Sequence, residues 1–87
     1  MSYEIPKIAD PAILARVTES VTKFFQHEMP PADKVTVTQI IPTSRGNIRA
    51  FVKLEVFING VAKTNTSVIK ARTDARNYIV PDTVVYL

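Results

Sequence analysis

The feature that most constrains this fold is the stretch from Asn47 to Lys70, where two segments flank the dipeptide Asn59-Gly60. Asn-Gly in that position is the strongest short-range signal of a β-hairpin, because both central residues of a type I′ turn need a positive φ. Strand side chains alternate between the two faces of a sheet, so the apolar residues before the turn share one face, which we expect in the core. They are Ile48, Ala50, Val52, Leu54, Val56 and Ile58.

The opposite face of the same segment interleaves cations with aromatic side chains. It consists of Arg49, Phe51, Lys53, Glu55 and Phe57. Cations beside aromatic rings are typical of surfaces that bind nucleic acids. The same pattern suits an outer face whose phenylalanines meet a partner subunit, and both interpretations stay open at this point.

Pairing of the two strands about Asn59-Gly60 places Arg49 opposite Lys70 and Val56 opposite Lys63. Lys63 then falls on the apolar side, which requires either a β-bulge or a hairpin that reaches past the end of the sheet. Two like charges in opposed positions destabilise a sheet unless an anion lies between them. The Arg49–Lys70 pairing therefore predicts a phosphate-binding position.

Composition limits the classes of protein that this chain can belong to. Its 87 residues make one small domain, 1–87, without cysteine and with His27 as the single histidine. Disulfides, a thiolate metal site and a histidine-based metal cluster are thereby excluded. No stretch has the pattern of a membrane span or a signal peptide, so we expect a cytoplasmic protein with no membrane partner and no cofactor.

The net charge of +3 is unevenly distributed along the chain. Residues 1–33 carry three Lys or Arg and five Asp or Glu, which gives −2, whereas residues 34–87 carry eight and three, which gives +5. A basic sheet region beside an acidic helical one predicts an anionic partner for the sheet, with ordinary charge scatter as the alternative.

A helix is expected from Pro11 to about Glu28. Asp10 is a suitable N-cap, Pro is favoured at the first helical position, and Pro30-Pro31 end the helix. Glu19 and Lys23 form a favourable i, i+4 pair. The apolar residues recur at helical spacing and predict a stripe that packs on the apolar face of the hairpin. They are Ile13, Leu14, Val17, Val21, Phe24 and Phe25.

Further strands are expected on both sides of the hairpin. Lys34–Ile41 alternates, with Val35, Val37 and Ile41 on one side and Thr36 and Thr38 on the other. The weakly patterned second hairpin strand, Val61–Lys70, is expected near an edge of the sheet. The order of elements predicts an α+β fold, with one N-terminal helix on an antiparallel sheet of four to five strands around a long central hairpin.

The C-terminal part is expected to begin with a basic loop or helical turn at Ala71–Arg76. A short strand, Asn77–Val80, is then broken at Pro81-Asp82, and Thr83–Leu87 forms a final apolar strand. That last strand needs a pairing partner, either within the chain or across a dimer.

Catalytic chemistry finds no support in the sequence. His27 is expected at the helix C-terminus, where a cation suits the helix dipole. The carboxylates after the helix are scattered and lack the paired spacing of acid/base catalysts. Without a nucleophile–base pair or a metal set, we expect neither an enzyme nor a small-molecule substrate.

The sequence instead favours binding through the basic sheet face, with phosphate contacts from cations and base stacking on phenylalanine. The candidate nucleic-acid-binding residues are Arg45, Arg49, Phe51, Lys53, Lys70, Arg72 and Arg76. A homodimer would cover the apolar C-terminal strand and the outer phenylalanines. The candidate interface residues are Phe51, Phe57, Val84 and Tyr86.

The segment Val37–Pro81 resembles the SpoVG family of small bacterial regulators. The resemblance rests on Arg49-Ala50-Phe51-Val52, on Ser67-Val68-Ile69-Lys70 and on Tyr78-Ile79-Val80-Pro81. In that family a further block with a helix follows these strands, whereas here Ile8-Ala9-Asp10-Pro11 and a helix precede them, as in a circular permutation. The family's basic segment is represented only by Pro81-Asp82-Thr83.

The resemblance implies a dimer that binds DNA or RNA. Together with the basic face, it leads to the expectation of a small nucleic-acid-binding regulator that acts as a homodimer. The alternative is a protein-interaction module, such as a phage-type inhibitor or an assembly subunit, that uses the aromatic face or a sheet edge.

Overall fold

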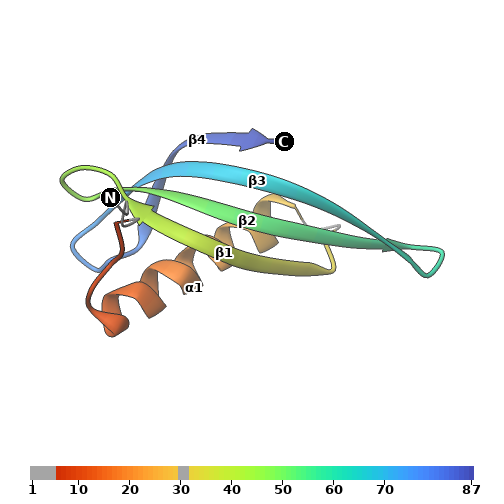
Figure 1. Cartoon of the computed structure of the whole chain (residues 1–87), viewed down its shortest axis with the longest axis horizontal. Helices are drawn as coiled ribbons and strands as arrows, with labels where there is room; N and C mark the ends of the chain where they lie inside the picture. The colour runs from red at the N-terminus through yellow and green to blue at the C-terminus, as the bar shows by residue number, and fades with distance from the viewer. Residues whose placement is uncertain (1–5, 30–31) are drawn as a thin grey trace, which may run out of the picture.

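The computed structural model describes residues 6–29 and 32–87, and it contains one helix on a four-stranded antiparallel sheet (Figure 1). The strands lie in the order of the sequence, β1-β2-β3-β4, so each pairs with the next along the chain. The expected α+β fold is confirmed. The elements are α1 (Pro11–Glu28), β1 (Lys34–Pro42), β2 (Asn47–Ile58), β3 (Val61–Thr73) and β4 (Ile79–Tyr86).

Helix α1 forms as its sequence predicts. The Asp10 carboxylate accepts a hydrogen bond of 2.8 Å from the Ala12 N–H, which caps the first turn. The apolar stripe faces the sheet, and Val17, Val21 and Phe25 are fully buried. The helix ends at Glu28, and the prolines expected to end it, Pro30 and Pro31, lie outside the described residues.

The hairpin of β2 and β3 has the register that the Asn59-Gly60 turn predicts. Both turn residues have positive φ, 51° and 79°, and Arg49 lies opposite Lys70. Val56 lies opposite Lys63 in an unbroken ladder, so no bulge intervenes. Lys63 is exposed because the hairpin extends beyond the end of the helix, as a projecting arm (Figure 1). The radius of gyration, 13.7 Å, exceeds the value of about 12 Å for a compact chain of this length.

The core lies between α1 and one face of the sheet. The first four of the expected core residues of β2 are buried, whereas Val56 is half-buried and Ile58 is exposed on the arm. On β3, Ser67 is fully buried among apolar neighbours, and its hydroxyl donates to the Val85 carbonyl at 3.0 Å. That bond satisfies a polar group which would otherwise be costly to bury.

The alternation expected in β1 is wrong after Val37. The register with β2 shifts between Val37 and Gln39, so that Ile40 pairs with Ala50 and Ile41 with Arg49. Ile40 is therefore the buried residue, 8% exposed, and Ile41 lies on the outer face. A bulge adds one residue to one strand and reverses the faces of everything after it, which a period-two pattern cannot anticipate.

Strand β3 is central, between β2 and β4, whereas its weak pattern predicts a place near an edge. It is exposed on the projecting arm, at residues 61–66, and buried at Ser67, Ile69 and Ala71. It continues to Thr73, so half of the expected loop Ala71–Arg76 is strand.

The two expected C-terminal strands are a single strand. Pro81-Asp82 does not end β4, which runs from Ile79 to Tyr86 with a register shift opposite Lys70 and Ala71. Because β4 is an edge strand, a proline there costs no hydrogen bond within the sheet. The final apolar segment finds its pairing partner within the chain, on β3, and the sheet has four strands.

Candidate functional site

The outer face of the sheet, on the side away from α1, is covered by no element of the described chain (Figure 1). The strand registers place its side chains in rows across the sheet. One row is Ile41, Arg49, Lys70 and Thr83, and the next is Gln39, Phe51, Val68 and Val85. A row of two cations therefore lies directly beside a row with a central aromatic ring.

Arg49 and Lys70 border a hollow of about 250 Å³. Arg49 is half-buried, and its Nε is buried without a hydrogen-bond partner. Neither cation forms a salt bridge with any carboxylate of the described residues. A buried donor without an acceptor is costly, so Arg49 lies at this hollow without its full set of hydrogen bonds. The remaining lining residues are Thr43, Asn47, Ile48, Ala71 and Asp82.

Three polar lining residues, Thr43, Asn47 and Asp82, are not among the site residues predicted from the sequence. Asn47 lies opposite Arg72, a pairing that follows from the hairpin register and could have been found there. Thr43 and Asp82 come from the β1–β2 loop and from the irregular part of β4. Asp82 places one negative charge at the hollow, which leaves a net charge of +1 among its lining residues.

Phe51 occupies the centre of the outer face. It is half-buried and lies between Gln39 on β1 and Val68 on β3. Arg49 precedes it by two residues on the same face, which corresponds to about 7 Å along a strand. An aromatic ring and a cation therefore lie within the reach of one small ligand.

Lys53 shares the outer face but differs from the other predicted cations. Its Nζ lies 3.4 Å from the Glu55 Oε1. This pair of residues on one strand partly neutralises the charge that the sequence assigns to binding. Lys53 is thus a weaker candidate for a phosphate contact than Arg49 or Lys70.

The other predicted cations gather at one end of the sheet. Arg72 is on the outer face of β3, opposite Asn47, and Arg45 and Arg76 lie in the two neighbouring loops. Those loops meet because both the N–H and the hydroxyl of Thr73 donate to the Gly46 carbonyl, at 2.8 and 3.0 Å. The structure therefore brings the two loop arginines to the same end as the Arg49–Lys70 pair.

Asp74 lies in the same region, but its carboxylate has a structural role. It accepts hydrogen bonds from the N–H groups of Arg76 and Tyr78, at 2.8 and 3.0 Å. These bonds close the β3–β4 turn as an Asx-type turn. The turn carries Arg76 outward as an exposed residue.

The four residues expected at a dimer interface do not form one patch. Phe57 is 54% exposed near the tip of the arm, six residues and about 20 Å along the strand from Phe51. Val84 and Tyr86 lie on the helix side of β4, and the Tyr86 ring meets Phe25 edge-on with centroids 6.5 Å apart. Phe51 alone of the four belongs to the centre of the outer face.

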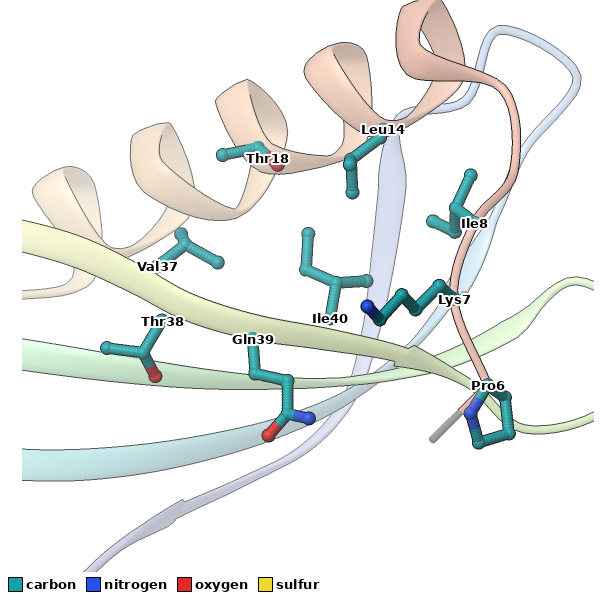
Figure 2. Close-up of a pocket in the computed structure, with 9 residues that line it drawn as sticks. All are labelled: Pro6, Lys7, Ile8, Leu14, Thr18, Val37, Thr38, Gln39 and Ile40. Carbon is teal, nitrogen blue, oxygen red and sulfur yellow. The ribbon is translucent and has the colours of Figure 1, made fainter. Parts of the chain in front are cut away.

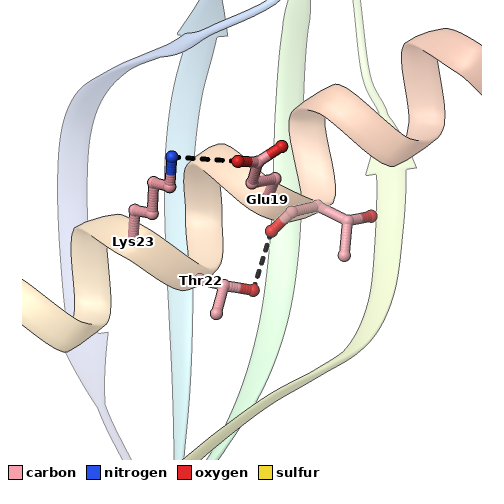
Figure 3. A network of polar contacts seen from close by, with 4 residues as sticks. Glu19, Thr22 and Lys23 are labelled. Carbon is pink, nitrogen blue, oxygen red and sulfur yellow. Dashed lines mark hydrogen bonds and ion pairs between the residues drawn. The ribbon is translucent and has the colours of Figure 1, made fainter.

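The outward face of α1 is a solvated polar surface (Figure 3). Lys23 Nζ lies 2.9 Å from Glu19 Oε1, and the hydroxyl of Thr22 donates to the Thr18 carbonyl at 2.8 Å. The hydrogen bond and the charge of Lys23 lower the pKa of Glu19 from its ordinary value. The expected i, i+4 pair is confirmed, and the cation here is matched by an acid.

A second hollow, of about 320 Å³, lies between the N-terminal segment, α1 and the edge strand β1 (Figure 2). Leu14, Val37 and Ile40 point into the space between helix and strand, and Lys7 lies across it (Figure 2). Its apolar lining residues lie on the helix side of the sheet, opposite to the Arg49–Lys70 hollow, whereas Thr38 and Gln39 border it from the other face of β1. It forms a separate feature from the basic face.

The described residues contain no group of three or more His, Asp or Glu that could hold a metal ion. His27 occupies the last turn of α1, as expected. No helix in the described part of the chain is long and apolar enough to cross a membrane.

No family model matches the sequence, and no curated protein or solved structure is significantly similar to it. The assignment of a function therefore depends on the geometry of the outer face.

Proposed function

We propose that this protein is a small regulatory protein that binds DNA or RNA through the outer face of its sheet and acts as a homodimer in the cytoplasm. The observation that carries the proposal is the opposed pair Arg49 and Lys70, on an uncovered face and without a carboxylate partner among the described residues. A nucleic-acid backbone presents a series of phosphate groups, each with one negative charge, to such a set of cations.

Each part of the face has a role in this proposal. Arg49 and Lys70 contact one phosphate, and Arg72 with the loop residues Arg45 and Arg76 extends the positive track toward the end of the sheet. Phe51 contacts a base or sugar. The charge of +5 on residues 34–87 and the resemblance to the SpoVG family support the same assignment.

The dimer in this proposal forms through the free edge of β4. The Leu87 N–H donates to the Thr66 carbonyl at 2.8 Å, and Ser67 bonds the Val85 carbonyl. In an antiparallel pair the intervening residues direct their N–H and C=O groups away from the partner strand, so Val84 and Tyr86 present theirs at the edge. Pairing of two β4 edges would join the two outer faces into one continuous surface.

The experiment is a binding titration of the intact protein against single- and double-stranded DNA and RNA at two salt concentrations. We expect affinity to fall steeply as salt rises, with a log–log slope of about −0.9 per phosphate neutralised on duplex DNA and about −0.7 on a single strand. Absence of binding to every nucleic acid at low salt would reject the proposal.

One observation favours a second candidate, a protein-interaction module. The tip of the projecting arm exposes Phe57, Ile58 and Val61, which are 54%, 47% and 62% exposed. Clustered apolar side chains on a projecting hairpin suit contact with another protein. This second candidate gains support if the protein binds no nucleic acid.

A further inference from the structure

We infer that the ligand of the outer face is a single-stranded nucleic acid, held by one backbone phosphate in the Arg49–Lys70 hollow and by one base stacked on Phe51. The inference deepens the proposed function, on which it rests, by choosing between single strand and duplex. The inference rests on two neighbouring residue rows of the face, because one row offers a phosphate position and the next offers a flat aromatic ring.

The hollow supplies the phosphate position. Its two cations come from different strands, in directly opposed positions, so one anion can contact both. Arg49 and Lys70 both line the hollow, and a phosphate oxygen is an acceptor that strengthens a bond to either cation by its charge. Asn47 and Thr43 add uncharged polar groups to the lining, and Asp82 reduces the attraction for an anion to a net charge of +1.

Phe51 supplies the base position. The ring is half-buried between Gln39 and Val68, on the uncovered face of the sheet. The next apolar neighbour along the row is Val85, 48% exposed, on β4. A partly exposed aromatic ring on an open sheet face can contact the flat face of a base, an interaction that tolerates every base type.

The spacing of the two positions selects the single strand. Arg49 and Phe51 are two residues apart on one strand, about 7 Å, so a phosphate in the hollow places its own nucleotide over the ring. The bases of a duplex are stacked on each other and paired, and their flat faces cannot reach Phe51 unless the duplex opens. A duplex could use the cations of this face but would leave the aromatic ring without a role.

The test compares three 12-nucleotide probes by fluorescence anisotropy: a single strand, the duplex of the same sequence, and a single strand of abasic sugar-phosphate. Wild-type protein is expected to bind the single strand at least ten-fold more tightly than the other two. Phe51→Leu is expected to lose about ten-fold or more for the single strand, with little change for the duplex and the abasic strand. Arg49→Gln is expected to weaken binding to all three.

Tyr78→Leu is the matched control. It removes a different aromatic ring, from a residue that is 49% exposed. The next residue anchors this segment to the helix, because the Ile79 N–H donates to the Ser20 hydroxyl at 2.9 Å. It should leave the affinity for all probes unchanged, and thermal unfolding should show every variant folded.

Equal affinity of wild-type protein for duplex and single strand would overturn the inference and leave the proposed function intact, as would an unchanged single-strand affinity in Phe51→Leu. Absence of binding to all three probes would overturn both.

Discussion

Arg49 on β2 and Lys70 on β3 are directly opposed in the central strand pair, on the face of the sheet that α1 leaves uncovered. Like charges in opposed positions of an antiparallel pair destabilise it. No acid among the described residues pairs with either side chain. The free domain therefore carries a small electrostatic cost that a bound anion would remove.

Removal of one of the two charges should stabilise the free protein. We expect Lys70→Gln to raise the free energy of unfolding by about 0.2–1 kcal/mol at low salt, and to raise it less at high salt because of screening. Urea unfolding at low and at high ionic strength measures the gain in the free energy of unfolding under each condition. Lys53→Gln is the control, since Lys53 has Glu55 as a partner and its loss should bring no gain. A destabilised Lys70→Gln protein would contradict this account of the pair.

The same cations should dominate binding. Arg49→Ala and Lys70→Ala should each weaken binding across all sequences tested, and each should make the salt dependence shallower by about 0.7–0.9 in the log–log slope. Arg16→Ala and Lys23→Ala, on the exposed surface of α1, keep the same net charge as those variants and should have little effect. Equal losses from both pairs of variants would mean that net charge alone decides binding.

The dimer proposal has a test at the free edge of β4. Val84→Pro removes an N–H that faces the edge, so it should block pairing between two β4 strands and yield a monomer. Val84→Ala loses packing on the core but keeps the N–H, so it should stay dimeric. Sedimentation velocity distinguishes the two states, and a monomeric wild-type protein at high micromolar concentration would exclude the proposed dimer. Deletion of residues 83–87 is a poorer test, because it also uncovers Phe25.

Much of the fold follows from local sequence signals. The start of α1 follows from Asp10-Pro11, and its orientation follows from the apolar stripe. The Asn59-Gly60 turn fixes the register of β2 with β3, and this register places Arg49 opposite Lys70. These signals depend only on residues close together in the sequence and on the spacing of apolar residues along the chain. Local signals are therefore sufficient to predict the central cation pair of the candidate site.

The misjudged features depend on contacts between distant residues. The bulge in β1 places Ile40, and not Ile41, on the core face of the sheet. The register shift near Asp82 lets the two expected C-terminal strands form one strand, β4. Strand β3 looks like an edge strand because its first half lies on the solvated arm. The hollow at Arg49 combines residues of four segments, and only the fold brings these together.

Alkaline pH should destabilise the fold through Tyr86. Tyr86 is 48% exposed, but partial desolvation where its ring meets Phe25, and to a lesser extent the negative charge of Glu28, raises the pKa of this phenol above its ordinary value of 10.0. The folded protein then keeps a proton that the unfolded chain releases, so stability falls as pH rises above about 10. Urea unfolding at pH 9 and 11 should show a smaller decrease for Tyr86→Phe than for wild type.

The most direct test of the central claim is a ¹H–¹⁵N correlation spectrum of the protein titrated with a 12-nucleotide single strand at low salt. Binding on the outer face predicts that the largest amide shifts cluster in the central rows of the sheet, at residues 49–53, 66–72 and 80–85, while residues 12–24 of α1 shift little. Shifts concentrated on α1 or on the arm tip at residues 57–61, or no shifts at all, would contradict a nucleic-acid site on the outer face.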